Sequence, residues 1–395
     1  MLKPTIVLLG KRYWPAHGGS ETFMQQTARV AREFGDVVIV TIAFSDSHDM
    51  SHAGLYANPP SGTPYRDPEG NLVVPPSPSP FARLLLLPLH LMRIPFVANA
   101  GNGMFRHALF AFVRLACLRR LLALCRDAVC IHSFEGNFLG GLGEEAARRL
   151  GVPFVIMPFV HPGSWGDDAF NKDLYKKANA VLTACEYEKA WFEAAGVAPS
   201  SLAAVGGYPE AKPAFSVRAK FGIQGSLILF YGRRETYKGW KVVRNAWNEI
   251  SQAERTWWLA LVGAGFEESI DNQKRIVTMP PPEGSPVADC DIFCMPSTSE
   301  TFGLVYVEAW THARPVIACD IPSSRELFHG EEPGLLVECE QAAVTAALVH
   351  LMRDPAHCRS MGAAGKRLVE HYYSRENYEQ KIRSEYERCL GRPGL

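Results

Sequence analysis

The sequence lacks the features that mark zinc-binding, disulfide-stapled or membrane-spanning proteins. None of its 10 Cys forms a Cys-x-x-Cys pair or has a His-x3–5-His partner, so neither a zinc site nor a disulfide framework is indicated. A reducing cytoplasm fits this cysteine usage best. No run of about 18 uncharged apolar residues occurs, which argues against a membrane-spanning helix. The apolar start Thr5–Gly10 has no small-residue cleavage site after it, which indicates a first strand and not a signal peptide.

Net charge is absent as well. The 41 Lys and Arg balance the 41 Asp and Glu, so there is no global positive field for binding nucleic acid. A hydrophobic fraction of 47% and a charged fraction of 21% suit a globular protein and exclude an acidic disordered tail or a collagen-like repeat. The length of 395 residues predicts two domains of roughly 150–200 residues each.

Short apolar runs alternate with helical patterns along the chain, which predicts a doubly wound α/β architecture. Continuous apolar runs of this kind are typical of parallel strands that are covered on both faces. Strands are expected at Ile6–Leu9, Val37–Ile42, Ala128–Ile131, Phe154–Phe159, Val181–Ala184, Leu227–Tyr231, Trp258–Val262, Ile292–Met295 and Pro315–Ala318. Helices are expected at Glu21–Glu33, Gly140–Leu150, Tyr187–Ala195, Trp240–Ile250, Val305–Thr311 and Ala342–Arg353.

A linker is indicated midway along the chain. Gly and Pro concentrate in Val205–Pro213, and a new series of strands begins at Leu227. We therefore expect an N-terminal domain at 1–208 and a C-terminal domain at 217–372. The last segment, 373–395, is charged and helical with few apolar positions, so we expect it to pack back on the N-terminal domain.

The most informative stretch is Asp291–Ala309, which has the pattern of a strand, a polar loop and then a helix. A helix that opens at Phe302–Gly303 presents unpaired backbone N–H groups and the positive end of its dipole, which suit a phosphate. Glu300 stands in the loop and Glu308 lies about two turns down the helix. Their carboxylates can therefore reach different hydroxyl groups of one extended ligand.

Two cations follow an earlier predicted strand. The strand Leu227–Tyr231 ends at a glycine and places Arg233 five residues before Lys238. Two fixed cations at the carboxyl end of a strand can neutralise a departing diphosphate without a metal, because negative charge accumulates on that leaving group in the transition state.

The N-terminal half offers a glycine pair and two histidines. Gly18 and Gly19 follow the first strand and precede a helix, and paired glycines let a ligand approach the backbone closely. His161 and His132 each stand at the carboxyl end of a predicted strand. A single His in such a place is either a site residue or a structural one, and the residues alone leave both readings open.

These patterns together resemble the family 4 retaining glycosyltransferases, in which two Rossmann-like doubly wound domains face each other across a cleft, the GT-B fold. The spacing of Glu300 and Glu308 matches that family's Glu-x7-Glu motif. The spacing of Arg233 and Lys238 looks like its Gly-Arg…Lys-Gly signature, which implies that both cations bind phosphate. The resemblance covers nearly the whole chain and is strongest from Leu227 to Leu336.

The resemblance also implies a role for each residue of the Glu-x7-Glu segment. Glu300 would contact the hydroxyls of the donor sugar, and Glu308 would hold the ribose. The backbone of Phe302, Gly303 and Leu304 would meet the diphosphate.

In the N-terminal domain, the resemblance implies that Gly18 and Gly19 lie beside the diphosphate and the acceptor when the cleft closes. It implies that His161, rather than His132, lies near the donor sugar and the reaction centre. His132 would line the cleft or the core, and Arg234 would point away from the phosphates.

The predicted function is transfer of a sugar, with retention of its configuration, from a UDP- or GDP-type nucleoside diphosphate sugar. The acceptor would be a hydroxyl of a small molecule, a glycan or a lipid-linked molecule, in glycoconjugate, polysaccharide or natural-product biosynthesis. No metal and no cofactor is expected besides the nucleotide sugar as co-substrate, and no nucleic acid partner. The alternatives are a GT-B sugar-nucleotide epimerase and a non-catalytic sugar-nucleotide-binding subunit.

Two other motifs compete with this interpretation. Gly263-Ala264-Gly265 suggests a nicotinamide dinucleotide site, but Glu268 stands at the third glycine position, so a dehydrogenase is rejected. Asp289-Cys290-Asp291 has the Asp-x-Asp spacing that binds Mn²⁺ in another class of glycosyltransferase. It directly precedes the strand that leads to Glu300, where the family often has Ala-Asp, so we expect a structural role.

The sequence also has a local charge asymmetry. No Asp or Glu occurs from Gly70 to Arg126, where seven Arg stand among Leu, Phe and Pro. Met104–Cys125 has a helical pattern, whereas Asp46–Pro80 is rich in Pro, Gly and Ser and is expected to be loop. Residues 81–126 are either a peripheral contact with the inner face of a membrane, a groove for the acceptor, or an ordinary helical layer with Arg stems over the core.

Overall fold

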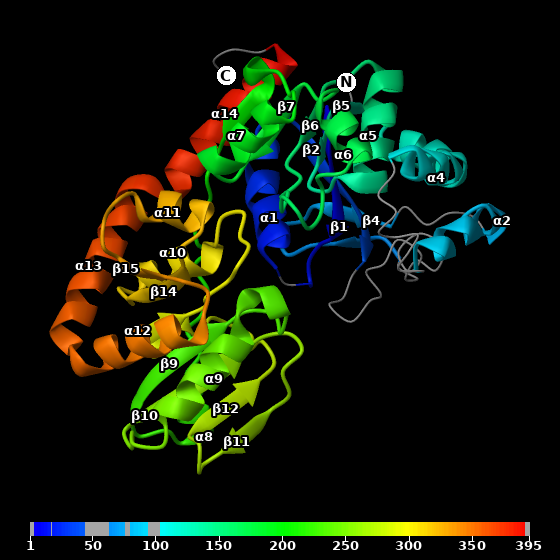
Figure 1. Cartoon of the computed structure of the whole chain (residues 1–395). Helices are drawn as coiled ribbons and strands as arrows, with labels where there is room; N and C mark the ends of the chain where they lie inside the picture. The colour runs from blue at the N-terminus through cyan, green and yellow to red at the C-terminus, as the bar shows by residue number, and fades with distance from the viewer. Residues whose placement is uncertain (1–3, 17, 44–62, 76–79, 94–102, 392–395) are drawn as a thin grey trace. The chain divides into compact units, whose positions relative to one another are not determined.

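The computed structural model describes residues 4–16, 18–43, 63–75, 80–93 and 103–391. The chain divides into two compact units (Figure 1). Unit 1 consists of Met1–Val205 together with Glu379–Leu395, and unit 2 consists of Gly206–Tyr378. Each unit is built on its own mostly parallel sheet with helices packed on it, which confirms the predicted α/β architecture.

Unit 1 contains an eight-stranded sheet with the order β3-β4-β2-β1-β5-β6-β7-β8. All neighbouring strands are parallel except β3 and β4. The strands are β1 (Thr5–Arg12), β2 (Asp36–Ala43), β3 (Tyr65–Arg66), β4 (Leu72–Val74), β5 (Ala128–Ser133), β6 (Phe154–Ile156), β7 (Ala180–Thr183) and β8 (Leu202–Ala204).

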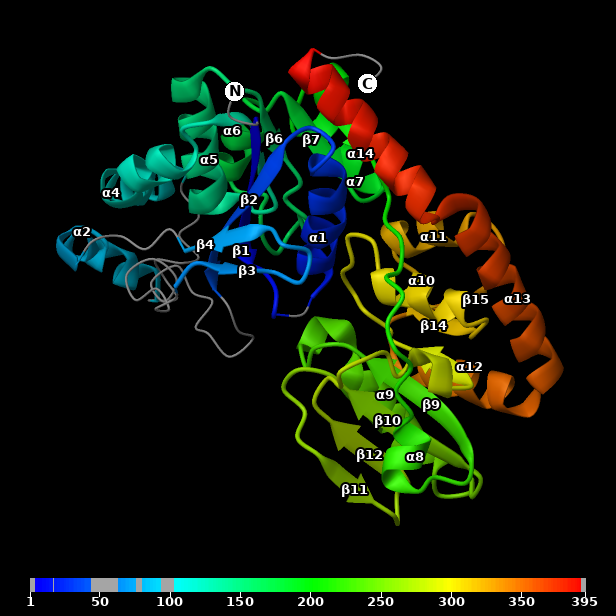
Figure 2. The ribbon, with the colours of Figure 1, turned by 180° about the vertical axis from the view of Figure 1, so that it is seen from behind.

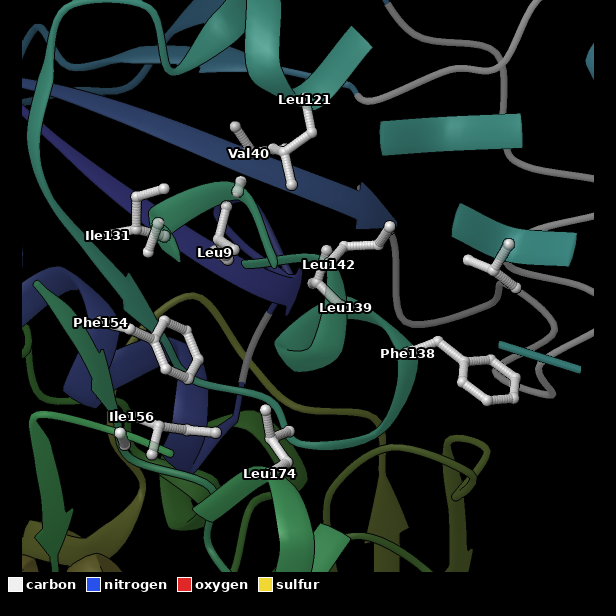
Figure 3. Close-up of a cluster of buried hydrophobic side chains, with 14 of the residues drawn as sticks. Leu9, Val40, Leu121, Ile131, Phe138, Leu139, Leu142, Phe154, Ile156 and Leu174 are labelled. Carbon is white, nitrogen blue, oxygen red and sulfur yellow. The ribbon is translucent and has the colours of Figure 1, made fainter. Parts of the chain in front are cut away.

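The helices of unit 1 cover this sheet and bury its apolar residues. They are α1 (Gly19–Ala31), α2 (Pro80–Leu84), η2 (Leu87–Arg93), α4 (Gly103–Leu124), α5 (Asn137–Leu150), α6 (Ala169–Tyr175), α7 (Glu186–Ala194), η3 (Pro199–Ser201) and most of α14 (Arg375–Leu390). Figure 3 shows the core that joins Leu9 and Ile131 of the sheet to Leu139 and Leu142 of α5. Helix α5 lies close to the sheet because Gly143 has no side chain, and a Cβ there would come within 3.0 Å of Leu9.

The C-terminal helix α14 packs on unit 1, as the view from behind shows (Figure 2). The Tyr386 hydroxyl lies 2.9 Å from Nδ1 of His132, and the Tyr386 ring packs edge-on against Phe34 at 5.5 Å. Arg383 forms two hydrogen bonds of 2.6 Å with Glu33. His132 is fully buried, and this burial lowers its pKa to about 3. His132 is therefore a buried, neutral contact for the last helix.

Unit 2 contains a seven-stranded sheet with the order β11-β12-β10-β9-β13-β14-β15, parallel except for β11 and β12. The strands are β9 (Ser226–Tyr231), β10 (Trp257–Val262), β11 (Ser269–Asp271), β12 (Ile276–Met279), β13 (Ile292–Cys294), β14 (Val316–Cys319) and β15 (Gly334–Val337). The helices are α8 (Val217–Phe221), η4 (Thr236–Lys238), α9 (Trp240–Ile250), η5 (Val287–Asp289), α10 (Leu304–Thr311), α11 (Pro322–Phe328), α12 (Gln341–Arg353) and α13 (Pro355–Tyr372).

Two sequence expectations need correction. The stretch Asp46–Pro80 was expected to be loop, but it contains β3 and β4, which extend the sheet from β2; residues 46–62 and 76–79 lie outside the described residues. No disulfide was indicated, yet Cys319 at the end of β14 is bonded to Cys339, just after the parallel neighbour β15. Among the described helices, none is long and apolar enough to cross a membrane.

Candidate active site

The two motifs of unit 2 meet because β9 and β13 are parallel neighbours, with Ile228 opposite Ile292. The carboxyl ends of parallel neighbours lie at the same edge of a sheet, where α/β proteins bind their ligands. The loops that leave these ends are joined at the carbonyl of Tyr237. It accepts hydrogen bonds from the N–H of Thr298 at 2.8 Å and from the hydroxyl of Ser297 at 3.1 Å.

An ion pair crosses between the two loops. Lys238 Nζ donates a 2.6 Å hydrogen bond to Oε1 of Glu300. Only 16% of the lysine side chain and 8% of the glutamate side chain are exposed. A charge-assisted hydrogen bond with so little solvent around it fixes both groups. Two predicted site residues from different motifs therefore lie in direct contact.

Gly239 allows the loops to approach this closely. Its φ of 79° lies in the left-handed region that glycine adopts without cost. A Cβ at Gly239 would come within 3.0 Å of the carbonyl of Pro296, which belongs to the loop after β13. Both the backbone conformation and the packing therefore require glycine next to Lys238.

The two arginines of the β9 loop have different surroundings. Arg233 is exposed, and its Nη2 donates a 2.8 Å hydrogen bond to the hydroxyl of Tyr237. The guanidinium of Arg234 lies 4.8 Å from the centre of the Trp240 ring and 5.7 Å from that of Phe266. Cation–π contacts of this kind hold an arginine against aromatic rings. Lys238 Nζ lies 5.2 Å from the centre of the Tyr237 ring, so Tyr237 contacts both predicted phosphate ligands.

The predicted phosphate-binding site lies at the start of α10. Gly303 precedes the helix with φ of 90°, and no side chain caps the first turn. Tyr306 fixes this start, because its hydroxyl donates a 2.7 Å hydrogen bond to the carbonyl of Met295. Phe302 is buried and packs edge-on against Tyr373 at 5.6 Å. The backbone of Phe302, Gly303 and Leu304 thus lies at the positive end of the helix dipole.

Glu308 lies on the buried side of α10. Its Oε2 is 3.9 Å from Lys212 Nζ, and its Oε1 is buried with no hydrogen-bond partner among the residues the structure describes. Burial, with a smaller contribution from the Glu308 charge, raises the pKa of Tyr231 to about 12. A buried carboxylate oxygen that has no hydrogen-bond donor, as Oε1 of Glu308 has none among the described residues, can accept a hydrogen bond from a ligand hydroxyl.

The glycine pair of unit 1 opens α1. Arg12 Nε lies 2.6 Å from Oε1 of Glu21, which is only 3% exposed. A Cβ at Gly18 would come within 3.0 Å of the Glu21 carboxylate, whereas a Cβ at Gly19 would have no atom within 4 Å. A side chain at position 18 would therefore push the Glu21 carboxylate out of its present position beside Arg12. Sequence reasoning missed Arg12, because nothing in its spacing links it to Glu21.

His161 follows β6 and is 8% exposed. Its imidazole lies 3.8 Å from the Trp165 indole, centre to centre. Nearby, Phe159 packs on Phe23 of α1 at 5.1 Å. The segment with His161 and the helix that begins at Gly19 are thus in contact within unit 1. Unit 2 brings together Arg233, Lys238 and Glu300, and unit 1 carries Gly18, Gly19 and His161.

The Asp-x-Asp motif at 289–291 and the glycine motif at 263–265 both make contacts within unit 2 that explain their residues structurally. The guanidinium of Arg218 binds Asp289 at 3.2 Å and also binds Asp291, whose carboxylate accepts the N–H of Leu227 at 2.8 Å. Within the described ranges, no group of three or more His, Cys, Asp or Glu side chains could hold a metal. A Cβ at Gly263 would come within 3.0 Å of the carbonyl of Gly232, so this glycine lets the loop after β10 pack on the loop after β9.

Two family models match consecutive parts of the chain. Residues 18–206 match the model described as "Glycosyl transferase 4-like domain", and residues 225–354 match "Glycosyl transferases group 1". Both matched parts are therefore similar to glycosyltransferase domains, and together they cover most of the chain. The first match coincides with most of unit 1, and the second lies within unit 2. Each unit contains one mostly parallel sheet with helices packed on it.

Solved structures with the GT-B fold align with almost the entire chain. HepE from Anabaena, in complex with UDP and glucose, aligns with a TM-score of 0.70 and 16% identity over 98% of this chain and 100% of its own. Sucrose-phosphate synthase from Thermosynechococcus elongatus aligns with a TM-score of 0.70 and 17% identity over 98% of this chain and 99% of its own. At these identities the likeness shows the fold alone.

Curated relatives match the chain over shorter stretches. The phosphatidyl-myo-inositol mannosyltransferase of Mycobacterium leprae is 32% identical over 160 residues, which are 38% of this chain and 43% of that protein. The D-inositol 3-phosphate glycosyltransferase of Pseudarthrobacter chlorophenolicus is 42% identical over 96 residues, which are 22% of this chain and 23% of that protein. The chain thus spans less than half the length of these relatives.

Proposed function

We propose that the protein is a retaining glycosyltransferase that moves a sugar from a nucleoside diphosphate sugar to an acceptor hydroxyl. The observation that carries the proposal is the Lys238–Glu300 ion pair, which lies beside Arg233 at the adjoining carboxyl ends of β9 and β13. In this proposal the two cations oppose the charge of the leaving diphosphate, and the carboxylate next to them accepts sugar hydroxyls. The two family matches support the same class of enzyme.

In the proposed reaction, the acceptor oxygen forms a bond to the anomeric carbon of the donor sugar as the bond from that carbon to the diphosphate breaks. Attack occurs on the face from which the diphosphate leaves, so the configuration is retained. A phosphate oxygen of the leaving group takes the proton of the acceptor hydroxyl, and no carboxylate base is needed. Arg233, Lys238 and the start of α10 stabilise the charge that develops on the diphosphate.

The remaining residues bind the donor. Glu300 accepts hydrogen bonds from the donor sugar, and the buried Oε1 of Glu308 accepts one from a ribose hydroxyl. The backbone of residues 302–304 meets the diphosphate. We propose that the reaction needs no metal, since two side-chain cations and a helix dipole already oppose the phosphate charge. A turnover rate that survives an excess of EDTA is the expected result.

For the donor we propose a UDP- or GDP-type nucleotide sugar, and for the acceptor a small-molecule, glycan or lipid-linked hydroxyl. The names of two relatives mention phosphatidyl-myo-inositol and inositol 3-phosphate, and the Anabaena structure contains UDP. These names support a search among inositol-containing and lipid-linked acceptors in glycoconjugate, polysaccharide or natural-product biosynthesis.

The cytoplasmic, membrane-peripheral location is part of this proposal. Leu86 and Leu89 of the α2–η2 segment are buried in the same core cluster as residues of α4, and both views show α2 beside α4 (Figures 1 and 2). Leu84, Leu87 and Leu115 remain 61%, 56% and 66% exposed. An apolar surface with exposed Arg and no acidic side chain from Gly70 to Arg126 suits an anionic lipid surface.

Co-sedimentation with vesicles tests the location separately from the chemistry. The wild type should pellet with vesicles of phosphatidylglycerol and phosphatidylcholine, and less so as salt is raised. Leu84→Asn with Leu115→Asn should pellet less, whereas the control Ile270→Asn, which alters an exposed apolar residue of unit 2, should not differ from the wild type. Equal sedimentation of all three proteins would contradict the membrane contact.

Donor binding is the first test of the enzyme. Wild type and Arg233→Ala are compared by thermal shift with UDP, GDP, ADP, dTDP and CDP, and then with their sugars. A ligand at about 100 times its Kd adds about 2.7 kcal/mol, enough to move the melting temperature by several degrees. One nucleotide should stabilise the wild type and not the variant. If none stabilises the wild type, the donor site does not bind nucleotides as proposed.

Turnover distinguishes the proposed enzyme from its alternatives. Glu300→Ala should lower turnover by orders of magnitude while nucleotide binding is largely kept. A sugar-nucleotide epimerase would consume the donor with no second substrate. A non-catalytic subunit would bind the donor and never release its sugar, even slowly by hydrolysis.

A further inference from the structure

The segment after β6 forms a closed hairpin that the predicted function does not explain. His161 and Trp165 form an antiparallel bridge. The N–H of His161 donates to the carbonyl of Trp165 at 3.1 Å, and the N–H of Trp165 donates back to the carbonyl of His161 at 3.0 Å. The two rings lie 3.8 Å apart and 33° from parallel. The indole is therefore held against the imidazole by the backbone as well as by ring contact.

A buried carboxylate holds the base of the hairpin. Glu188 of α7 is only 4% exposed. Its Oε1 accepts the N–H of Val160 at 2.9 Å, and its Oε2 accepts the N–H of Ala184 at 2.9 Å. One buried side chain thus links the loops that follow β6 and β7. It holds the backbone N–H of Val160, the residue before His161.

Two more contacts fix the far end of the hairpin. Asp167 accepts the N–H of Gly163 at 2.7 Å, and the hydroxyl of Tyr175 donates to the carbonyl of Gly166 at 2.9 Å. Gly163 and Gly166 have φ of 79° and 84°, in the left-handed region that glycine readily adopts. The hairpin is consequently anchored on both sides of Trp165.

The backbone of the same segment is strained at a residue that is not glycine. Phe159 has φ of 51°, and its ring packs on Phe23 of α1 at 5.1 Å. Left-handed conformations of bulky residues are unfavourable and concentrate at active sites and ligand clamps, where surrounding contacts impose them. Contacts such as the one between Phe159 and Phe23 therefore hold this backbone conformation in place.

The hairpin leaves part of its aromatic surface exposed. Trp165 is 43% exposed, whereas the His161 beside it is 8% exposed. A rigid, partly exposed indole offers a large apolar contact area at a small entropic cost, because few torsions must be fixed on binding. Sugar and cyclitol rings have one apolar face of C–H groups, which stacks on aromatic rings.

We propose that Trp165 is the platform on which a sugar or cyclitol ring of the substrate stacks beside His161. The proposal rests on the proposed function for the origin of the ring. It assigns the ring to the acceptor, because Trp165 belongs to unit 1, which the family resemblance makes the acceptor-binding domain. Glu188 is a positioning residue that acts through the hairpin.

Saturation-transfer NMR on the full chain tests the platform with myo-inositol, methyl α-D-glucopyranoside and methyl α-D-mannopyranoside as ring probes. The wild type should bind at least one probe, Trp165→Phe should keep most of the affinity, and Trp165→Ala should bind about tenfold more weakly. Tyr187→Ala is the matched control, because Tyr187 is an aromatic residue of unit 1 that is 41% exposed. Failure of the wild type to bind any probe, or equal binding by Trp165→Ala, would overturn the proposal.

Two further measurements test which substrate stacks on Trp165 and whether Glu188 positions the hairpin. The KM for the donor, measured by hydrolysis of UDP-glucose or GDP-mannose without acceptor, should be the same in Trp165→Ala and in the wild type if the ring belongs to the acceptor. A raised KM for the donor would instead assign the ring to the donor sugar. Glu188→Gln replaces one accepting oxygen with an amide donor. It should weaken probe binding without altering the thermal shift that nucleotides produce, and an unchanged probe affinity would remove Glu188 from the positioning role. Nucleotide binding itself tests the proposed function independently.

Discussion

The ion pair of the candidate active site can be measured with a double-mutant cycle of Lys238→Met and Glu300→Gln. Exposed ion pairs contribute about 0–1 kcal/mol, and removing one partner of a fully buried pair costs about 3–5 kcal/mol. With side-chain exposures of 16% and 8%, this pair lies between these limits. We expect each single variant to lower the free energy of unfolding by about 1–3 kcal/mol. The double variant leaves no charge unpaired, so it should lose less than the sum, with a coupling of about 1–2 kcal/mol.

Urea unfolding followed by tryptophan fluorescence gives the four free energies. A matched cycle on Arg325 and Asp320 serves as the control, because this pair also belongs to unit 2 but its side chains are 64% and 38% exposed. The control coupling should stay below about 0.5 kcal/mol. A Lys238–Glu300 coupling no larger than the control would refute the argument that burial between the two loops strengthens the pair.

The same cycle separates stability from chemistry. Both single variants should lose turnover, since the proposed reaction uses the lysine charge on the diphosphate and the carboxylate on the donor sugar. The double variant should regain part of its stability and none of its turnover. If Lys238→Met with Glu300→Gln were as active as the wild type, the pair would be structural and the proposed roles would be wrong.

Three further predictions concern stability. Burial lowers the pKa of His132 to about 3, so the unfolded chain binds a proton below pH 6.5 that the folded protein does not bind. Urea unfolding should therefore show that the free energy of unfolding falls by at most about 1.4 kcal/mol per pH unit as the pH drops from 6.5 towards 3. The fall should be less steep in His132→Phe. Gly239→Ala should lower the melting temperature and the nucleotide-induced shift more than Gly222→Ala does. Both glycines have positive φ, but only a Cβ added at position 239 would lie against another loop. Equal losses would show that the backbone conformation alone is responsible. Cys339→Ser should lower the free energy of unfolding by about 3 kcal/mol, the value expected for a disulfide between residues 20 positions apart. The difference between this variant and the wild type should vanish in dithiothreitol. If dithiothreitol does not change the stability of the wild type, the bond does not form.

The strands that form the middle of each sheet could be predicted because both of their faces are buried. Runs such as Ile6–Leu9 and Leu227–Tyr231 are apolar at every position, as the helices on both sides require. The short edge strands β3 and β11 were missed, because two or three residues in a polar or Pro-rich context carry no periodic signal.

The site residues could be proposed from spacing within a motif, but contacts between motifs could not. The Lys238–Glu300 pair joins residues 62 positions apart and depends on β9 and β13 being neighbours. The Arg12–Glu21 pair and the disulfide of Cys319 likewise depend on how neighbouring elements pack. Gly18, Phe302 and Glu308 were proposed from the resemblance; Gly18 directly precedes α1, Phe302 lies just before α10, and Glu308 lies within α10.

The return of α14 to unit 1 has a consequence for how the protein is made. Unit 1 contains Glu379–Leu395 as well as Met1–Val205, so its last piece leaves the ribosome only after all of 206–378. At roughly 5–20 residues per second, the contact surface of His132 and Phe34 waits on the order of ten seconds or more for Tyr386. The first unit to be synthesised is therefore the last to be completed, and a messenger truncated near its end would damage the N-terminal unit while leaving the inserted unit whole.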